Sequence, residues 1–112
     1  MTVDEILDDR VRKILKDPSG ESWTDLELLA WYNDAARIIM GKKSVSRLDA
    51  NGDEITYAEA TATSDTVQLD DVWVMALTHY VCSLAFLQEG GDRQHLDRSD
   101  THWNRFIDML NL

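Results

Sequence analysis

Apolar residues recur every three or four positions in four stretches of the chain, at about 3–15, 25–40, 72–87 and 96–110. This spacing places them along one side of a helix. The intervening segment, at about 44–68, loses the periodicity. We therefore expect an all-α protein: a compact four-helix domain with an irregular loop or a short β-hairpin between the second and third helices. At 112 residues the chain has the size of a single domain.

The third and fourth stretches differ in how their apolar residues are distributed. In the third, apolar residues occupy nearly the whole circumference, which is typical of a helix that is central or is covered by a neighbouring subunit. In the fourth they form a narrow seam suited to packing against one partner helix. The seam consists of Leu96, Ser99, Trp103, Phe106 and Leu110.

Polar residues near the first two stretches add local detail. Thr24 is followed three positions later by Glu27, which is the capping-box pattern of a helix start. The basic run of the first stretch falls on its polar side beside several aspartates, and we interpret it as a solvated face with internal charge pairing. This run consists of Arg10, Arg12, Lys13 and Lys16.

The segment at about 44–68 carries turn and strand signals in place of helical ones. Asn51-Gly52 is a strong tight-turn dipeptide, and the threonine-rich residues 55–63 alternate weakly between apolar and polar. A long loop in a small domain is usually functional or ordered by a partner. We expect a projecting loop, with Asn51, Gly52 and Tyr57 as candidates for contacts with a partner.

The charge of the chain narrows the classes of partner. It carries 21 acidic and 11 basic residues, for a net charge of −10. A firm grip on nucleic acid needs clustered Lys and Arg, so direct DNA binding is not expected. The acidity is compatible with a solvated surface, with a DNA mimic, or with a wall along which DNA slides without sticking.

Cysteine usage and hydropathy predict a soluble protein in a reducing compartment. The single cysteine, Cys82, cannot form an internal disulfide. The first residues are acidic rather than basic, so no signal peptide is expected. The longest apolar run, at about 72–87, is interrupted by Thr78, His79 and Ser83 and is too short to span a bilayer. We expect no membrane partner.

No residue pattern indicates catalysis, a metal or a cofactor. The acidic turn at 49–55 resembles a calcium loop, yet no register places glycine, hydrophobe and glutamate at the required positions. The histidines and Cys82 lack zinc-site spacing, and we interpret His79 as a hydrogen-bonded residue beside the core. No adjacent carboxylate pair lies in an apolar pocket that would raise a pKa. We expect a protein that is not an enzyme.

The tryptophans point instead to protein–protein contact. There are 4 of them, many for a chain of this size, and aromatic residues are enriched at interface cores. Two fall away from the main apolar stripes and one falls on the seam of the last helix. The predicted contact residues are Trp31, Trp73, Trp103, Phe106 and Leu110.

Three motifs together resemble a known family. The pattern W-x-x-x-E-L-L-x-W-x-N-D-A-x-R is followed by Trp23, Glu27, Leu28, Leu29, Trp31, Asn33, Asp34, Ala35 and Arg37. The pattern A-L-x-x-Y-V-x-x-x-A-F/Y is followed by Ala76, Leu77, Tyr80, Val81, Ala85 and Phe86. The closing pattern H-Y/W-x-x-F is followed by His102, Trp103 and Phe106. The motifs fall within two ranges, about residues 22–40 and 70–110. Over these ranges the chain resembles the head-to-tail adaptors of tailed bacteriophages.

The resemblance implies a structural protein of the virion neck, made in the host cytoplasm. It implies a homo-oligomeric, commonly dodecameric ring that docks on the portal protein and offers its other side to a tail or stopper protein. DNA would pass through without specific binding. Longer family members carry a β-containing insertion between the second and third helices, which a threonine-rich loop replaces here. The compact helical form of adaptor is therefore the closer comparison.

An acidic protein-binding module or DNA-mimic inhibitor is the alternative reading. Such a protein presents a dense acidic stripe to a basic partner. Along this sequence the acidic residues are scattered among Lys and Arg, which favours the adaptor. Moderate salt would abolish binding by a mimic, whereas apolar docking would persist.

Overall fold

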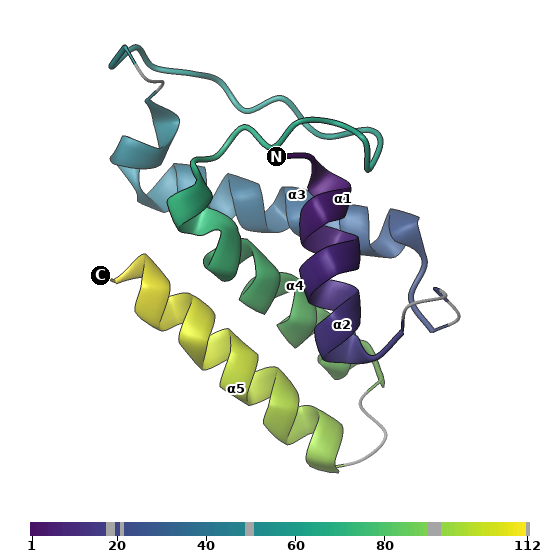
Figure 1. Ribbon diagram of the computed structural model, residues 1–112. Helices are drawn as coiled ribbons and strands as arrows, with labels where there is room; N and C mark the ends of the chain where they lie inside the picture. The colour runs from purple at the N-terminus through teal and green to yellow at the C-terminus, as the bar shows by residue number, and fades with distance from the viewer. Residues whose placement is uncertain (18–19, 21, 49–50, 90–92, 112) are drawn as a thin grey trace.

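The computed structural model describes residues 1–17, 20, 22–48, 51–89 and 93–111, and over these residues the chain is mainly helical with no strand or sheet (Figure 1). Four helices follow the four apolar stretches, which confirms the all-α prediction. The first is continuous and consists of α1 (Val3–Ile6), η1 (Leu7–Val11) and α2 (Arg12–Leu15). The others are α3 (Asp25–Lys42), α4 (Val74–Glu89) and α5 (Arg93–Leu110), with the single turns η2 (Ser44–Arg47) and η3 (Asp71–Trp73) between α3 and α4.

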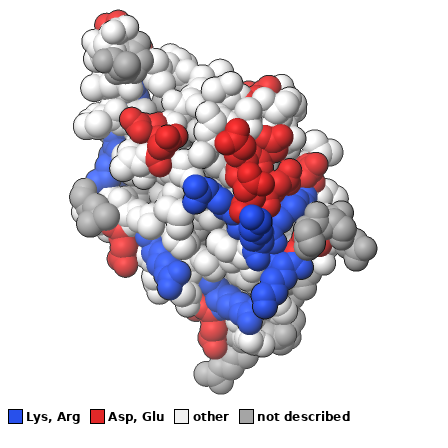
Figure 2. All heavy atoms as spheres, viewed as in Figure 1, with Lys and Arg blue, Asp and Glu red and all other residues white. Residues whose placement is uncertain are grey.

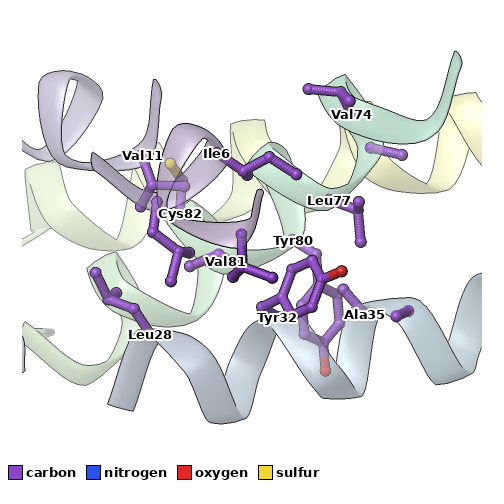
Figure 3. Close-up of a cluster of buried hydrophobic side chains, with 14 of the residues drawn as sticks. Ile6, Val11, Leu28, Tyr32, Ala35, Val74, Leu77, Tyr80, Val81 and Cys82 are labelled. Carbon is purple, nitrogen blue, oxygen red and sulfur yellow. The ribbon is translucent and has the colours of Figure 1, made fainter. Parts of the chain in front are cut away.

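The helix α4 lies at the centre of the fold. It packs against α5, α3 and the first helix. Its own chain therefore covers most of the side chains of α4 and leaves a few exposed. Figure 3 shows the cluster of buried side chains where α4 meets α3 and the first helix. Each large aliphatic side chain buried there contributes about 1.5–3 kcal/mol. Among the described residues, no helix combines the length and apolarity needed to cross a membrane.

The first helix contains a π-helical turn that shifts its register. An extra residue in the turn at Leu7–Val11 displaces every later position by about 100° relative to a regular α-helix. As a result Ile14, expected from the apolar spacing to face the core, is 37% exposed. Arg12 instead turns inward and is only 5% exposed. The interpretation of the basic run as a solvated face is therefore wrong for Arg12.

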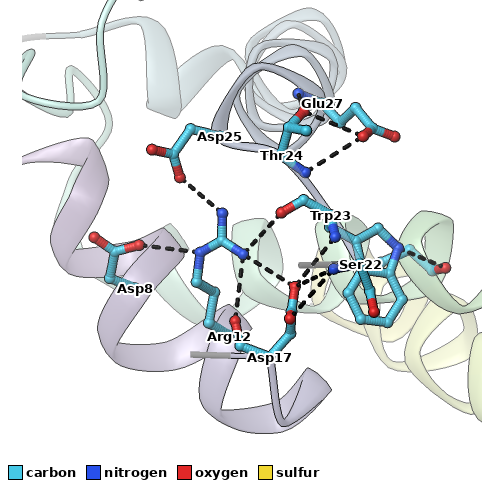
Figure 4. Close-up of polar contacts among 9 residues, drawn as sticks. Asp8, Arg12, Asp17, Ser22, Trp23, Thr24, Asp25 and Glu27 are labelled. Carbon is cyan, nitrogen blue, oxygen red and sulfur yellow. Dashed lines mark hydrogen bonds and ion pairs between the residues drawn. The ribbon is translucent and has the colours of Figure 1, made fainter. Parts of the chain in front are cut away.

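The side chain of Arg12 links the first helix to the start of α3 through ion pairs and hydrogen bonds (Figure 4). Its guanidinium lies 3.3 Å from a carboxylate oxygen of Asp17 and 2.7 Å from one of Asp25. It also donates a 2.9 Å hydrogen bond to the carbonyl of Trp23. The predicted capping box is confirmed beside it, since Thr24 Oγ1 accepts from the Glu27 amide at 3.2 Å.

The loop between η2 and η3 is irregular in its described part, and the short β-hairpin is not found there. Only isolated bridges occur, pairing Leu48 with Glu54 and Thr2 with Thr66. The reason is that the backbone of this segment bonds to other partners. Carbonyls of Thr63 and Asp65 accept hydrogen bonds from the amides at the start of α1, at 2.7 and 2.9 Å. The loop consequently runs along the N-terminus, as Figure 1 shows.

Candidate interaction surface

The seam between α4 and α5 holds three of the five predicted seam residues inside the fold. Phe106 is 0% exposed, and Ser99 and Leu110 are buried with it. The ring of Phe106 packs edge-on against Tyr80 of α4, with centroids 5.0 Å apart. Leu96 and Trp103, the other two, are 40% and 42% exposed. The sequence pattern therefore identified the face of α5 that packs against α4. It did not show which residues at the edge of that face stay partly exposed.

A shallow apolar groove lies beside this seam, and we call it the α4–α5 groove. Its volume is about 350 Å³, and it is lined by Ser83, Leu84, Leu87, Ser99, Asp100 and Trp103. The indole of Trp103 packs against two aromatic rings of the core. Its centroid lies 6.1 Å from that of Tyr80 and 5.8 Å from that of Phe106. A partly exposed indole held in place by buried rings is the kind of residue that carries binding energy at interfaces.

One carboxylate lies in the groove, and two others lie on the neighbouring helix α3. Asp100 lines it directly. Burial raises the pKa of the Tyr80 hydroxyl, and the negative charge of Asp34, which is paired with Arg37 at 3.8 Å, adds to the rise. A hydrogen bond with the Gln88 side chain lowers the pKa of Glu27, so the start of α3 lies beside the end of α4. The lining of the groove is thus mainly apolar, with two serines and one carboxylate, that of Asp100.

A histidine pair lies on the opposite side of the seam. The Nδ1 atoms of His79 and His102 are 2.9 Å apart, so one nitrogen donates a hydrogen bond to the other. The His102 ring stacks on Phe86 at 5.7 Å. Burial lowers the pKa of His102 to about 4, with further contributions from His79 and from the positive charge of Arg105. The prediction of a hydrogen-bonded His79 beside the core is confirmed.

Neither this pair nor Cys82 belongs to a metal-binding cluster in the described part of the chain. No group of three or more His, Cys, Asp or Glu side chains converges there on a point where a metal would bind. Cys82 is 0% exposed, and burial raises the pKa of its thiol to about 12. The thiol therefore stays protonated and out of reach of reagents.

Charged residues are segregated on the face that carries the first helix and α5. Figure 2 shows Asp and Glu gathered over the upper part of the first helix, with Lys and Arg across its lower part and α5. The acidic residues at the start of that helix are Asp4, Glu5, Asp8 and Asp9. The sequence suggested a more even mixture. The acidic patch is bounded by cations and does not extend over this whole face.

The other predicted contact residues lie on separate elements. Trp31 is half-buried on α3 and Trp73 is half-buried in η3. Neither residue therefore lies on α4 or α5, the two helices that carry the groove residues. Asn51 and Gly52 are exposed at a turn, where Gly52 takes a φ of +83°. The assignment of these residues, and of Trp103, Phe106 and Leu110, to a partner stays a prediction.

Tyr57 binds its own chain instead of projecting. Its hydroxyl donates a hydrogen bond to Oδ1 of Asn33 on α3, and the Arg37 guanidinium lies 5.7 Å from the centre of its ring. Asn33, only 2% exposed, also bonds the amide and carbonyl of Ala60, at 2.9 and 3.0 Å. The importance of Asn33 for the loop was not predicted, although it lies in one of the family motifs.

No family model, curated protein or solved structure matches this chain. Its function is therefore argued from its surface and from the resemblance of its motifs.

Proposed function

We propose that this chain is a structural head-to-tail adaptor of a tailed phage, which forms a ring under the portal, connects the portal to tail components and lets DNA pass. The observation that carries the proposal is the α4–α5 groove. The chain completes its own core, yet it presents a 42% exposed indole in an apolar groove of about 350 Å³. Such a surface favours a partner protein.

The residues divide into two roles under this proposal. Trp103, with Leu84 and Leu87 beside it, contacts a partner directly. Phe106 and Leu110 are buried beneath and hold α5 on α4, which keeps the indole in position. Trp31 and Trp73, each half-buried, remain candidates for a second contact, with the portal or with a tail or stopper protein.

The charge of the chain supports passage of DNA through the ring. Its net charge of −10 repels phosphates on average, so DNA gains little from adhering to it. The acidic patch on the first helix is the observation that favours the alternative, an acidic protein-binding module or DNA mimic. Because Lys and Arg border that patch, a basic partner would meet mixed charge, and we prefer the adaptor.

Co-sedimentation with the portal protein encoded in the same genome tests the proposal. We expect the purified chain to pellet with portal rings, to form a ring in electron micrographs, and to stay bound in moderate salt. Trp103→Ala is expected to weaken binding by about thirtyfold or more, because truncating an aromatic hot spot costs about 2 kcal/mol or more. Leu26→Ala, at a 77% exposed position at the start of α3, serves as the matched control.

Two results would contradict the adaptor. If no protein pellets with the portal, the proposal fails. If binding to a basic partner is found that disappears in moderate salt, the alternative replaces it.

A further inference from the structure

A pocket distinct from the α4–α5 groove lies between α3 and the loop that joins η2 to η3, and we call it the loop pocket. Its volume is about 220 Å³, below the roughly 300–1,000 Å³ of pockets for drug-sized ligands. It therefore fits a group about the size of one amino-acid side chain. It shares no residue with the α4–α5 groove. The polar residues that line it are Tyr32, Tyr57, Glu59, Asp65, Thr66 and Gln68.

The hydroxyl of Tyr32 opens into the loop pocket without a partner. Tyr32 belongs to α3 and is only 1% exposed, within the buried cluster of Figure 3. Burial and the nearby Tyr57 raise the pKa of this hydroxyl well above its usual range, and no hydrogen bond within the described residues opposes the rise. Every fully buried side-chain nitrogen or oxygen in that part of the chain has a hydrogen-bond partner, so the small exposed area of Tyr32 lies at its hydroxyl. Because Tyr32 lines the loop pocket, this hydroxyl is available to a ligand there.

Two carboxylates give the loop pocket its negative charge. They belong to Glu59 and Asp65, and no Lys or Arg joins them in the lining that the described residues form. Oδ2 of Asp65 accepts hydrogen bonds from the amides of Thr61 and Ala62, at 2.8 and 3.1 Å, and these bonds lower the pKa of the carboxyl. Asp65 is therefore ionised at neutral pH and held by the loop backbone, while its Oδ1 can accept from a ligand.

Glu59 pairs with a cation outside the loop pocket. The guanidinium of Arg37 lies 3.2 Å from its carboxylate, and the same guanidinium lies 3.8 Å from that of Asp34. One positive charge is thus shared between two carboxylates. All three side chains are about half-exposed, so water weakens both pairs, and Glu59 keeps the capacity to accept from a second cation.

We infer that the loop pocket binds one alkylguanidinium or alkylammonium group, the cation that ends an arginine or lysine side chain or a free polyamine. The cation lies between the carboxylates of Glu59 and Asp65, and the Tyr32 hydroxyl accepts one of its N–H hydrogens. The ring of Tyr57 packs along the alkyl stem. Guanidinium and ammonium groups donate hydrogen bonds and accept none, and their bonds to carboxylates are the stronger, charge-assisted kind. The inference goes beyond the proposed adaptor and requires neither the ring nor the portal.

Other classes of ligand match this lining less well. An anion would face the two carboxylates, on a chain whose net charge of −10 already repels it. A purely apolar group would displace water from the Tyr32 hydroxyl and leave it without any partner, which costs about 1–3 kcal/mol. A cation on an apolar stem meets neither penalty.

Titration of the ¹⁵N-labelled chain with small cations, followed by NMR, tests the site. The probes are N-acetyl-arginine amide and spermidine, and the readout is the amide shifts of Ala58, Ala60 and Thr66. N-acetyl-citrulline amide, a neutral compound of nearly the same shape, is the control ligand. We expect saturable shifts with the cations and at least about tenfold weaker binding of the citrulline compound, because its charge-assisted bonds are lost. Tighter binding of the arginine compound identifies a partner's side chain as the ligand, and tighter binding of spermidine identifies a free polyamine.

Two variants locate the bound cation. Glu59→Gln is expected to weaken binding several-fold, whereas Glu54→Gln, at a 75% exposed position of the same loop that does not line the loop pocket, should leave it unchanged. Tyr32→Phe should weaken binding several-fold without lowering the urea midpoint, because its hydroxyl has no partner to lose within the described residues.

Three results would overturn the inference. The first is the absence of saturable shifts with either cation, and the second is equal binding of the arginine and citrulline compounds. The third is a lowered urea midpoint for Tyr32→Phe with unchanged binding, which would make the hydroxyl a structural group. None of these results bears on binding to the portal, so the adaptor is tested separately.

Discussion

Nη2 of Arg12 lies 2.7 Å from Oδ1 of Asp25, joining the end of the first helix to the first residue of α3. The two carboxylates that Arg12 meets besides Asp17, those of Asp8 and Asp25, are 55% and 64% exposed. Arg12 itself is 5% exposed. The cation therefore depends on these partners, whereas each exposed carboxylate retains water as a substitute.

Arg12→Met is expected to destabilise the fold by about 3 kcal/mol, because Asp17 would be left buried without its cation. Asp25→Ala is expected to cost about 1 kcal/mol or less, as is usual for an exposed partner. Urea unfolding measures both. Lys13→Met, at the exposed neighbouring position, is the control and should change little. Equal losses for Arg12→Met and Lys13→Met would refute a structural role for the buried guanidinium.

Asn33→Ala is expected to release the loop from α3. Its amide bonds both backbone groups of Ala60, and each buried backbone group left unpaired costs about 1–3 kcal/mol. We expect faster hydrogen exchange at the Ala60 amide and a lower unfolding midpoint. Asp34→Ala, on the adjacent exposed position, should leave that exchange rate unchanged. Slow exchange in Asn33→Ala would mean that other contacts hold the loop.

The positions of the helices could be predicted, because the periodicity of apolar residues along the sequence encodes them. Apolar spacing predicted all four helices. The all-round apolarity of α4 indicated either a central position or cover by a neighbouring subunit, and α4 is central in its own chain. The register of the first helix was not predictable, because the π-helical turn at Leu7–Val11 leaves no mark on the apolar spacing. As a result Arg12 is buried and Ile14 is exposed, the reverse of what the spacing indicates. Two neighbouring apolar residues on a stripe cannot reveal which of them the adjacent helix covers, as Phe106 and Trp103 illustrate.

The candidate site was predictable only in its aromatic residue. Trp103 was identified from its residue type, whereas the groove around it depends on how α4, α5 and the start of α3 meet. The course of the loop was also not predictable, since it depends on polar contacts between residues far apart in sequence, such as those between Asn33 and Ala60, 27 residues apart. Such single polar contacts carry no periodic signal.

The histidine pair is expected to make stability depend on pH. In the folded chain burial lowers the pKa of His102 to about 4 from 6.5, so the unfolded chain binds more protons between these values. Stability from this pair is therefore fully present above about pH 6.5 and is lost as the pH falls through about 4. His102→Gln should flatten this part of the pH profile relative to the wild type, as measured by urea midpoints from pH 7.5 to 4. An unchanged slope would show that the carboxylates alone set the acid sensitivity.

The contrast between Trp103 and Phe106 separates binding from folding. Phe106→Ala is expected to destabilise the chain by about 3–5 kcal/mol, because the ring is 0% exposed and its loss leaves a cavity under α5. Trp103→Ala removes a 42% exposed ring and should cost much less stability, yet it removes the aromatic side chain that lines the groove beside Leu84 and Leu87. Thermal unfolding measures the loss of stability, and co-sedimentation with the portal measures the loss of binding. If Trp103→Ala unfolds the chain as strongly as Phe106→Ala, the indole is part of the core and the groove has no claim to be a docking surface. If it leaves both stability and partner binding intact, the groove is an ordinary surface irregularity, and the contact with a partner must be sought at Trp31 or Trp73.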